Sequence, residues 1–190
     1  MVLAGSSKRI IRIGNNKPNL YHRDLLVAQE LAYEPSGFIY HNLIKEAESA
    51  EYGASTFEMN NRNIKFRIGK ITPTKIGQFV TLWKRIGDGV IQPHDLADPV
   101  DLFVVSVRNE EKFGQFVFPK LILFEKGFIS NQSKGGRRAM RIYPPWDIPD
   151  SQQAKKTQAW QLAYFLEIDP HKAVDVCRVQ KLSIIKRVPP

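Results

Sequence analysis

The sequence contains almost no cysteine: of its 190 residues, only Cys177 is of this type. An intramolecular disulfide is therefore excluded, and with it the class of small secreted scaffolds that depend on such bonds. The first ten residues, MVLAGSSKRI, show no long apolar run followed by a small-residue cleavage site, so no secretory signal is expected. Both absences predict a cytoplasmic protein in a reducing compartment.

Long hydrophobic runs are also absent. A membrane-spanning helix needs roughly 20 consecutive apolar residues, whereas the most apolar region, residues 113–129, is interrupted by Lys120, Glu125 and Lys126. We therefore expect no membrane insertion. A composition of 43% hydrophobic and 25% charged residues is typical of a globular chain, and the length suits one domain with its own core.

Several sequence motifs that are typical of known enzyme classes are missing. The chain has no Walker A sequence, no Gly-x-Gly-x-x-Gly and no Gly-x-Ser-x-Gly nucleophile elbow. Its four histidines, at positions 22, 41, 94 and 171, are scattered and form no zinc pattern with the single cysteine. These absences disfavour nucleotide hydrolysis, covalent catalysis and structural zinc, and no metal or cofactor is expected.

Acidic residues are few relative to basic ones. Lys and Arg number 28 against 19 Asp and Glu, which gives a net charge of +9, a balance that attracts nucleic acid or other polyanions. The alternative interpretation is a basic surface that only keeps the protein soluble. Between residues 60 and 87 there is no acidic residue, while seven basic residues occur with Phe66, Phe79 and Trp83 interleaved. The basic residues are Arg62, Lys65, Arg67, Lys70, Lys75, Lys84 and Arg85.

The pattern of apolar residues predicts an α+β fold in a single domain, with a mostly antiparallel, hairpin-rich sheet flanked by a few helices. A basic edge segment is expected at residues 1–20, the domain at 21–170 and a basic carboxy-terminal segment at 171–190. Helices are predicted at residues 20–32, 44–52 and 155–168. Strands are predicted at residues 55–59, 64–68, 79–83, 100–107, 113–124 and 138–143.

The basic residues predict a nucleic-acid surface, because cations neutralise phosphates and aromatic faces stack on bases. Strand alternation places Phe66 in the core and leaves Lys65 and Arg67 exposed together. A second basic patch at residues 134–138 contains two glycines that let an anion approach the backbone, or it is only a solvated loop. Predicted contacts to DNA or RNA are Lys65, Arg67, Lys70, Lys75, Trp83, Lys84, Arg85, Arg137, Arg138, Arg141 and Trp146.

A nuclease is the catalytic alternative, and it is the only one of these hypotheses that requires Mg²⁺. Such enzymes gather carboxylates and a lysine around the ion, and the candidates here are Glu46, Glu48, Asp101 and Lys120. A third alternative is an accessory protein that binds a small molecule or a protein partner in an aromatic-lined pocket. The sequence specifies no oligomeric state.

One tetrapeptide, Gly-Gln-Phe-Val, occurs twice, at residues 77–80 and 114–117. Each copy opens a predicted strand after a turn, so the repeat indicates either a shared geometry of strand entry or two strands that line one groove. The segment at residues 143–146, Tyr-Pro-Pro-Trp, is similarly open to two interpretations, a rigid recognition loop or a cap on a sheet edge.

A set of longer motifs resembles the MepB family over about residues 20–168. The resemblance implies membership of a family named from a bacterial gene cluster that also encodes a MarR-type repressor and a multidrug efflux transporter. It implies no established activity, and an accessory role linked to efflux is one expectation. The motifs are Tyr33-Glu34-Pro35, Glu46-x-Glu48-Ser49, Phe66-Arg67, residues 70–85 (KITPTKIGQFVTLWKR), residues 114–120 (GQFVFPK) and residues 143–147 (YPPWD).

Overall fold

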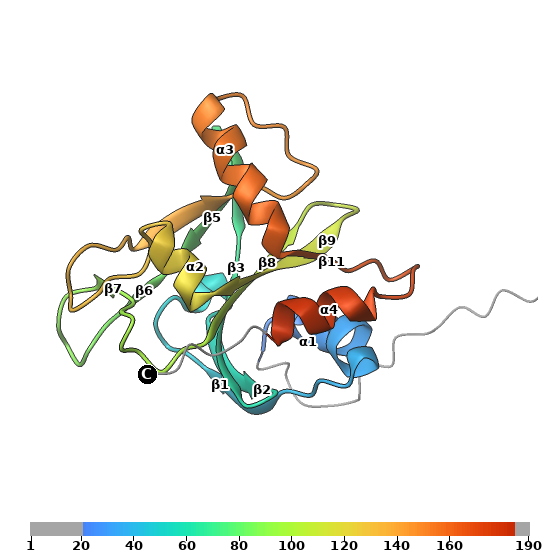
Figure 1. Cartoon of the computed structure of the whole chain (residues 1–190), viewed down its shortest axis with the longest axis horizontal. Coiled ribbons are helices and arrows are strands. Elements are labelled where there is room, and N and C mark those ends of the chain that lie inside the picture. The colour runs from blue at the N-terminus through green and yellow to red at the C-terminus, as the bar shows by residue number, and fades with distance from the viewer. Residues whose placement is uncertain (1–20, 185–190) are drawn as a thin grey trace, which may run out of the picture.

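A six-stranded sheet forms the centre of the molecule (Figure 1). The structure is a computed structural model that describes residues 21–184, so the predicted basic segment at residues 1–20 lies outside the described residues. The strand order is β1-β2-β3-β8-β9-β11. Their bounds are β1 His41–Lys45, β2 Ser55–Met59, β3 Arg62–Ile68, β8 Leu102–Arg108, β9 Phe113–Pro119 and β11 Phe165–Glu167.

Strands β8 and β9 are buried on both faces, because the sheet is covered on both sides. Along β8, Leu102 and Val104 pack into one hydrophobic cluster, whereas Phe103 and Val105 pack into the other. The first cluster lies under the helices at the two ends of the described chain. The second lies under a small second sheet and the helices α2 (Lys120–Glu125) and α3 (Gln152–Gln161) (Figure 1).

Neighbouring strands of the large sheet are antiparallel with one exception: β3 and β8 run parallel, with Ile64 opposite Leu102 and Ile68 opposite Ser106. A parallel pair requires a long crossover, and residues 69–101 supply it. The crossover carries most of the two small sheets, ordered β10-β5-β4 and β6-β7. The bounds are β4 Lys70–Thr72, β5 Lys75–Thr81, β6 Trp83–Lys84, β7 Gln92–Pro93 and β10 Ala139–Ile142.

The helices are short and each packs on one of the two clusters. Helix α1 (Arg23–Ala28) continues into a π-helical turn at Gln29–Tyr33 and lies beside α4 (Val176–Ser183) (Figure 1). Helices α2 (Lys120–Glu125) and α3 (Gln152–Gln161) cover the opposite side. Within residues 21–184 no helix combines the length and apolar character that crossing a membrane requires. The α+β class is confirmed.

Three predicted elements differ from the structure in type or in bounds, and in the first and third of them strand pairing overrides local propensity. The acidic helix expected at residues 44–52 is instead the end of β1, a turn and the 3₁₀ turn Ala50–Tyr52. The strand expected to reach residue 124 ends at Pro119, where α2 begins. The helix expected to reach residue 168 ends earlier, because Phe165–Glu167 pairs with β9 as β11.

The repeated tetrapeptide has the same packing role in both copies. Gln78 and Gln115 are buried, and their side-chain nitrogens donate to the Arg108 carbonyl (3.0 Å) and to Ser106 Oγ (2.9 Å), both on β8. The glycine before each glutamine faces an aromatic ring: a Cβ on Gly114 would lie 2.4 Å from the Phe165 ring. In both copies the glutamine therefore binds β8 and the glycine allows a close approach of an aromatic ring.

Candidate functional site

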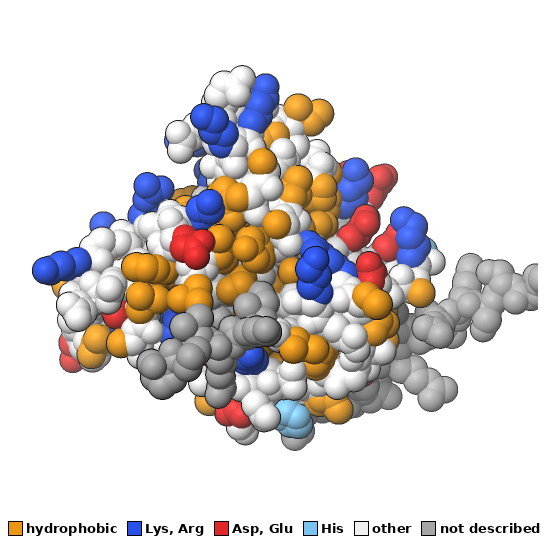
Figure 2. Space-filling model, viewed as in Figure 1, with side chains coloured by type: hydrophobic (Ala, Val, Ile, Leu, Met, Phe, Trp, Pro, Cys, Tyr) orange, Lys and Arg blue, Asp and Glu red, His pale blue; other side chains and the backbone are white. Residues whose placement is uncertain are grey.

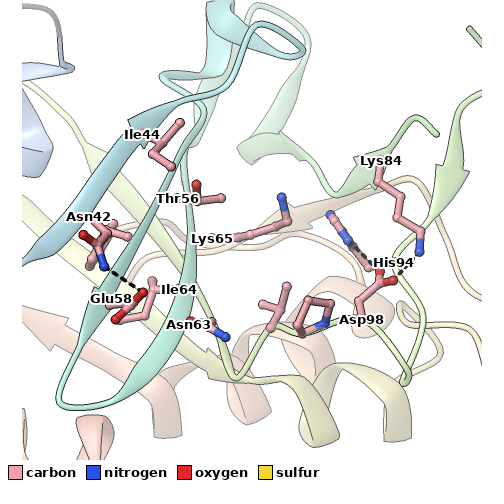
Figure 3. A pocket seen from close by; sticks show the side chains of 13 residues that line it. Asn42, Ile44, Thr56, Glu58, Asn63, Ile64, Lys65, Lys84, His94 and Asp98 are labelled. Carbon is pink, nitrogen blue, oxygen red and sulfur yellow. Dashed lines mark hydrogen bonds and ion pairs between the residues drawn. The ribbon is translucent and has the colours of Figure 1, made fainter. Parts of the chain in front are cut away.

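A cavity of about 430 Å³ opens between β2, β3 and the loop at residues 94–100 (Figure 3). Its apolar side chains are Ile44, Pro99 and Val100, whereas the side chains of Phe57 and Ile64 point to the other face of the sheet, into the first hydrophobic cluster. Its polar side is formed by charged residues and one histidine. The polar side chains are Lys65, Lys84, His94, Asp98 and, at the opposite rim, Glu58 with Asn42 and Asn63.

Strand register places the basic residue of β3 at this cavity. Lys65 lies directly opposite Thr56 of β2, so both side chains lie on one face of the sheet. Figure 3 shows both pointing toward the region of His94 and Lys84. Lys84 arrives from β6 on the crossover, which brings two cations that are far apart in sequence to one site.

The first cation cluster is built around Glu46. Its carboxylate contacts Lys65 Nζ, and its Oε2 lies 2.6 Å from Nη2 of Arg67, whose side chain is only 3% exposed. Burial lowers the pKa of Arg67, and Glu46 opposes that shift. Burial alone raises the pKa of Glu46, but the charges of Arg67 and Lys65 outweigh it and hold that pKa below its usual range. Glu46 is therefore the fixed counter-ion of a buried guanidinium.

The second cluster joins a histidine, an aspartate and a lysine. His94 is 1% exposed; its Nδ1 lies 3.1 Å from Asp98 Oδ2, and Asp98 Oδ1 contacts Lys84 Nζ. Burial raises the pKa of Asp98, but its hydrogen bond with Lys84 and others outweigh this and lower it, so the carboxylate is ionised and only accepts hydrogen bonds. The proton of the neutral imidazole is therefore on Nδ1.

The other ring nitrogen of His94 is the unusual atom of the cavity. Burial, followed by the charge of Lys65, lowers the pKa of His94 to about 4, so the ring is neutral at pH 7. Its Nε2 is buried and has no hydrogen-bond partner among residues 21–184. Buried acceptors are nearly always satisfied, so this lone pair in the wall of a cavity indicates a place for a ligand donor.

The loop that carries His94 is held from several sides. Ser130 N donates to the His94 carbonyl (2.8 Å), and Ser130 Oγ donates to Asp95 Oδ2 (2.7 Å). Hydrogen bonds to Asp95 from Ser130 and from backbone amides lower the pKa of that carboxyl to about 2. Lys120 Nζ donates to the carbonyls of Leu96 (2.6 Å) and Asp98 (2.8 Å). The position of the imidazole is thus fixed before any ligand arrives.

The predicted acidic segment, Glu46, Glu48 and Glu51, lies against the predicted basic residues. Besides the Glu46 cluster, Glu48 Oε1 lies 2.9 Å from Arg85 Nε, and Glu51 Oε2 lies 3.5 Å from Lys70 Nζ. Lys70 is also 4.4 Å from the centre of the Tyr52 ring. We call Lys65, Lys70, Lys84 and Arg85 the cationic strip, and residues 46–51 the acidic segment.

The remaining predicted nucleic-acid contacts have different surroundings. Arg67 was expected to be exposed, which is wrong, because the acidic segment covers its face of the sheet. Arg141 Nη1 donates to Thr72 Oγ1 (3.1 Å) and to the Gly77 carbonyl (2.9 Å), so it braces the β4–β5 turn. The half-buried Trp146 packs on Phe165 with 5.7 Å between ring centres. The other predicted nucleic-acid contacts are exposed or partly exposed residues: Lys75, Trp83, Arg137 and Arg138.

The four residues of the nuclease alternative serve other contacts. Glu46 and Glu48 pair with cations, as described above, and Asp101 Oδ2 accepts from the Asn63 amide at 2.9 Å. Lys120 holds the His94 loop. Among the described residues no group of three or more His, Cys, Asp or Glu is placed to hold a metal ion.

Sequence reasoning missed His94. It stood among four scattered histidines, and the signal that could have identified it is the spacing of four residues to Asp98, within Pro93-His94-Asp95-Leu96-Ala97-Asp98-Pro99. That spacing alone is weak, because Lys65 and Lys84 come to the site only through the fold.

Comparison with known proteins adds an independent finding. The family model described as MepB-like matches residues 46–167, which include Lys65, Lys84 and His94. A crystal structure of MepB is 32% identical to the chain, with a TM-score of 0.66. The match covers 78% of this chain and 97% of that one. No curated protein matches the chain.

Proposed function

The chain belongs to the MepB-like family, and we propose that it binds nucleic acid through the cationic strip. The observation that supports this most is the pairing of the strip with the acidic segment. Glu48 and Glu51 form ion pairs with Arg85 and Lys70, and the phosphate oxygens of a nucleic-acid strand form the same kind of ion pair with such cations. The strip thus presents cations to a succession of anionic groups.

The two outer ion pairs are of a kind that a ligand replaces easily. Glu48 and Glu51 have 48% and 69% of their side chains exposed. Ion pairs in such positions contribute about 0–1 kcal/mol and are screened by salt. Exchange of a carboxylate for a phosphate therefore costs little, whereas the buried Arg67 stays with Glu46.

The distribution of charge sharpens the proposal. Six of the nine excess positive charges come from Lys8, Arg9, Arg12, Lys17, Lys186 and Arg187, which lie outside the described residues. Figure 2 shows one face of the molecule, on which Lys and Arg side chains are dispersed among acidic and hydrophobic ones. Binding by net charge alone would therefore not depend on the strip, so a variant of the strip separates the two explanations.

The test uses fluorescence polarisation with labelled single- and double-stranded DNA and RNA at two salt concentrations, with and without Mg²⁺. We expect affinity to fall as salt rises, because bound phosphates release counter-ions. The double variant Lys70→Ala/Arg85→Ala should weaken binding by roughly tenfold at low salt. The matched control is Lys155→Ala/Lys156→Ala, two exposed cations of α3. An equal loss of affinity in both double variants would show that binding depends on net charge and not on the cationic strip.

A gel of the recovered oligonucleotide tests the nuclease alternative in the same experiment. Intact strands with Mg²⁺ present would contradict cleavage through Glu46, Glu48, Asp101 and Lys120. Cleavage that a chelator abolishes, and that Glu48→Gln also abolishes, would support it.

A second cavity favours the alternative of a small-molecule or protein partner. It measures about 450 Å³ and is lined by Ile71, Ile76, Trp146 and Ile148, with Lys75 among its polar residues. Ile71 and Ile148 are largely exposed, and such apolar surface is common at binding sites. Binding of an apolar fluorescent dye that Ile148→Ser weakens and Ile39→Ser leaves unchanged would support this use.

A further inference from the structure

We propose that the cavity beside His94 receives one unpaired nucleotide, with the base inside it and the phosphate at Lys84 and Lys65. The proposal rests on nucleic-acid binding for the class of ligand, and it names the part of the ligand that enters the protein. The nucleotide must be single-stranded or turned out of a duplex, because a stacked and paired base cannot enter a cavity of this kind.

The unpartnered Nε2 of His94 selects the base over the phosphate. His94 is neutral and its Nδ1 proton is engaged by Asp98, so Nε2 is a hydrogen-bond acceptor. A phosphodiester offers only acceptor oxygens and cannot satisfy it. The edges of nucleic-acid bases carry N–H groups that can donate to it. This buried, unpartnered acceptor therefore fits a base rather than a phosphate.

The walls of the cavity suit the same ligand. Ile44, Pro99 and Val100 give an apolar surface for the flat base, and the volume of about 430 Å³ lies in the range of small-molecule sites. Lys84 and Lys65 each contact a carboxylate, and an ammonium group has three donor hydrogens, so further donors remain for a phosphate. Glu58 at the opposite rim repels a second phosphate there and so fixes the direction of the ligand.

The hydrogen bonds from Ser130 and Lys120 to the His94 loop prepare this site in advance. A prepared acceptor loses little freedom on binding, which favours affinity for a small ligand. Single nucleotides are therefore sufficient probes, without the rest of a strand.

The test compares the four 5′-mononucleotides with ribose 5-phosphate, which has the same phosphate and sugar but no base. With the full chain, we expect at least one nucleotide to bind about tenfold or more tightly than ribose 5-phosphate by calorimetry. In a spectrum of ¹⁵N-labelled histidine, the ring signal of His94 should move on binding, while those of His22, His41 and His171 should not. His94→Leu identifies the signal.

A cavity-filling variant tests the same site independently, in case the His94 variant does not fold. Thr56→Phe places a ring in the cavity from the half-buried face of β2, and the control Thr74→Phe adds the same ring on an exposed turn. Thr56→Phe should reduce nucleotide affinity by about tenfold or more, and Thr74→Phe should leave it unchanged.

The outcomes separate this proposal from the proposed function. Equal binding of ribose 5-phosphate and all four nucleotides, unchanged affinity in Thr56→Phe, or a motionless His94 signal would each overturn it. If oligonucleotides still bind with salt dependence in that case, binding through the cationic strip is supported and only the nucleotide site in the cavity is contradicted. If nucleotides bind but Lys70→Ala/Arg85→Ala leaves oligonucleotide affinity unchanged, nucleic-acid binding through the cationic strip is contradicted and the nucleotide site in the cavity is supported.

Discussion

The two ends of the acidic segment differ in what their carboxylates do. At one end Glu46 faces the buried Arg67, and at the other end Glu51 faces the exposed Lys70. Each pair joins a glutamate to a basic residue, but Arg67 and Glu46 are far less exposed than Lys70 and Glu51. A buried pair cannot be broken cheaply, whereas an exposed pair exchanges with water and ligands. The comparison shows that burial, rather than charge, separates the structural cations from those available for binding.

The largest expected effect is at the buried end. Glu46→Gln leaves Arg67 buried without its carboxylate, so the free energy of unfolding should fall by about 3 kcal/mol or more. Urea denaturation measures it. Glu48→Gln, at an exposed position of the same segment, should change it by less than about 1 kcal/mol. Equal effects of the two substitutions would remove the distinction between the ends.

The next effect is the pH dependence that His94 imposes. Its pKa is about 4 in the folded protein and near the ordinary 6.5 when unfolded, so between these values the unfolded chain binds more protons. Stability therefore rises with pH in this window and is lost as pH falls, by roughly 2 kcal/mol from pH 7 to pH 5. Urea denaturation at several pH values measures this slope.

The control for the pH prediction is His94→Gln, which has no titrating ring and should flatten the slope between pH 7 and pH 5. The carboxyl groups with lowered pKa, Glu46, Asp95 and Asp98, titrate below this window. An unchanged slope in the variant would show that His94 is not held neutral.

The smallest effect is at the exposed end of the segment. Glu48→Gln/Glu51→Gln frees Arg85 and Lys70 from their carboxylates, so affinity for single-stranded DNA at low salt should rise by about three- to tenfold. Fluorescence polarisation measures the change, with Glu110→Gln/Glu111→Gln, two exposed residues of the β8–β9 turn, as the charge-matched control. A rise of the same size in the control would assign the effect to net charge.

The same comparison explains how far sequence patterns predict this molecule. Alternation along β3 correctly placed Phe66 in the core and Lys65 on the opposite face. It failed for Arg67, because alternation does not reveal that the acidic segment folds over that face. Glutamates on good helix formers predicted a helix at residues 44–52, yet pairing of Ile44 with Thr56 of β2 decided otherwise.

The candidate site was harder to predict than the fold. Lys65 and Lys84 were predicted as nucleic-acid contacts from local composition, but the cavity between them depends on the crossover and on the parallel pairing of β3 with β8. His94 gains its character from burial and from Lys65, which lies 29 positions earlier in the chain. Such long-range surroundings leave no pattern in a single sequence.

The most direct measurement is the salt dependence of single-stranded DNA binding by the wild type and by Lys70→Ala/Arg85→Ala. Each phosphate contact in a single strand contributes about 0.7 to the slope of log affinity against log salt, so loss of two contacts should reduce that slope by about 1.4. Such a reduction, absent from Lys155→Ala/Lys156→Ala, would place the strand on the cationic strip. The same slope in all three proteins, or no binding at low salt, would contradict the account.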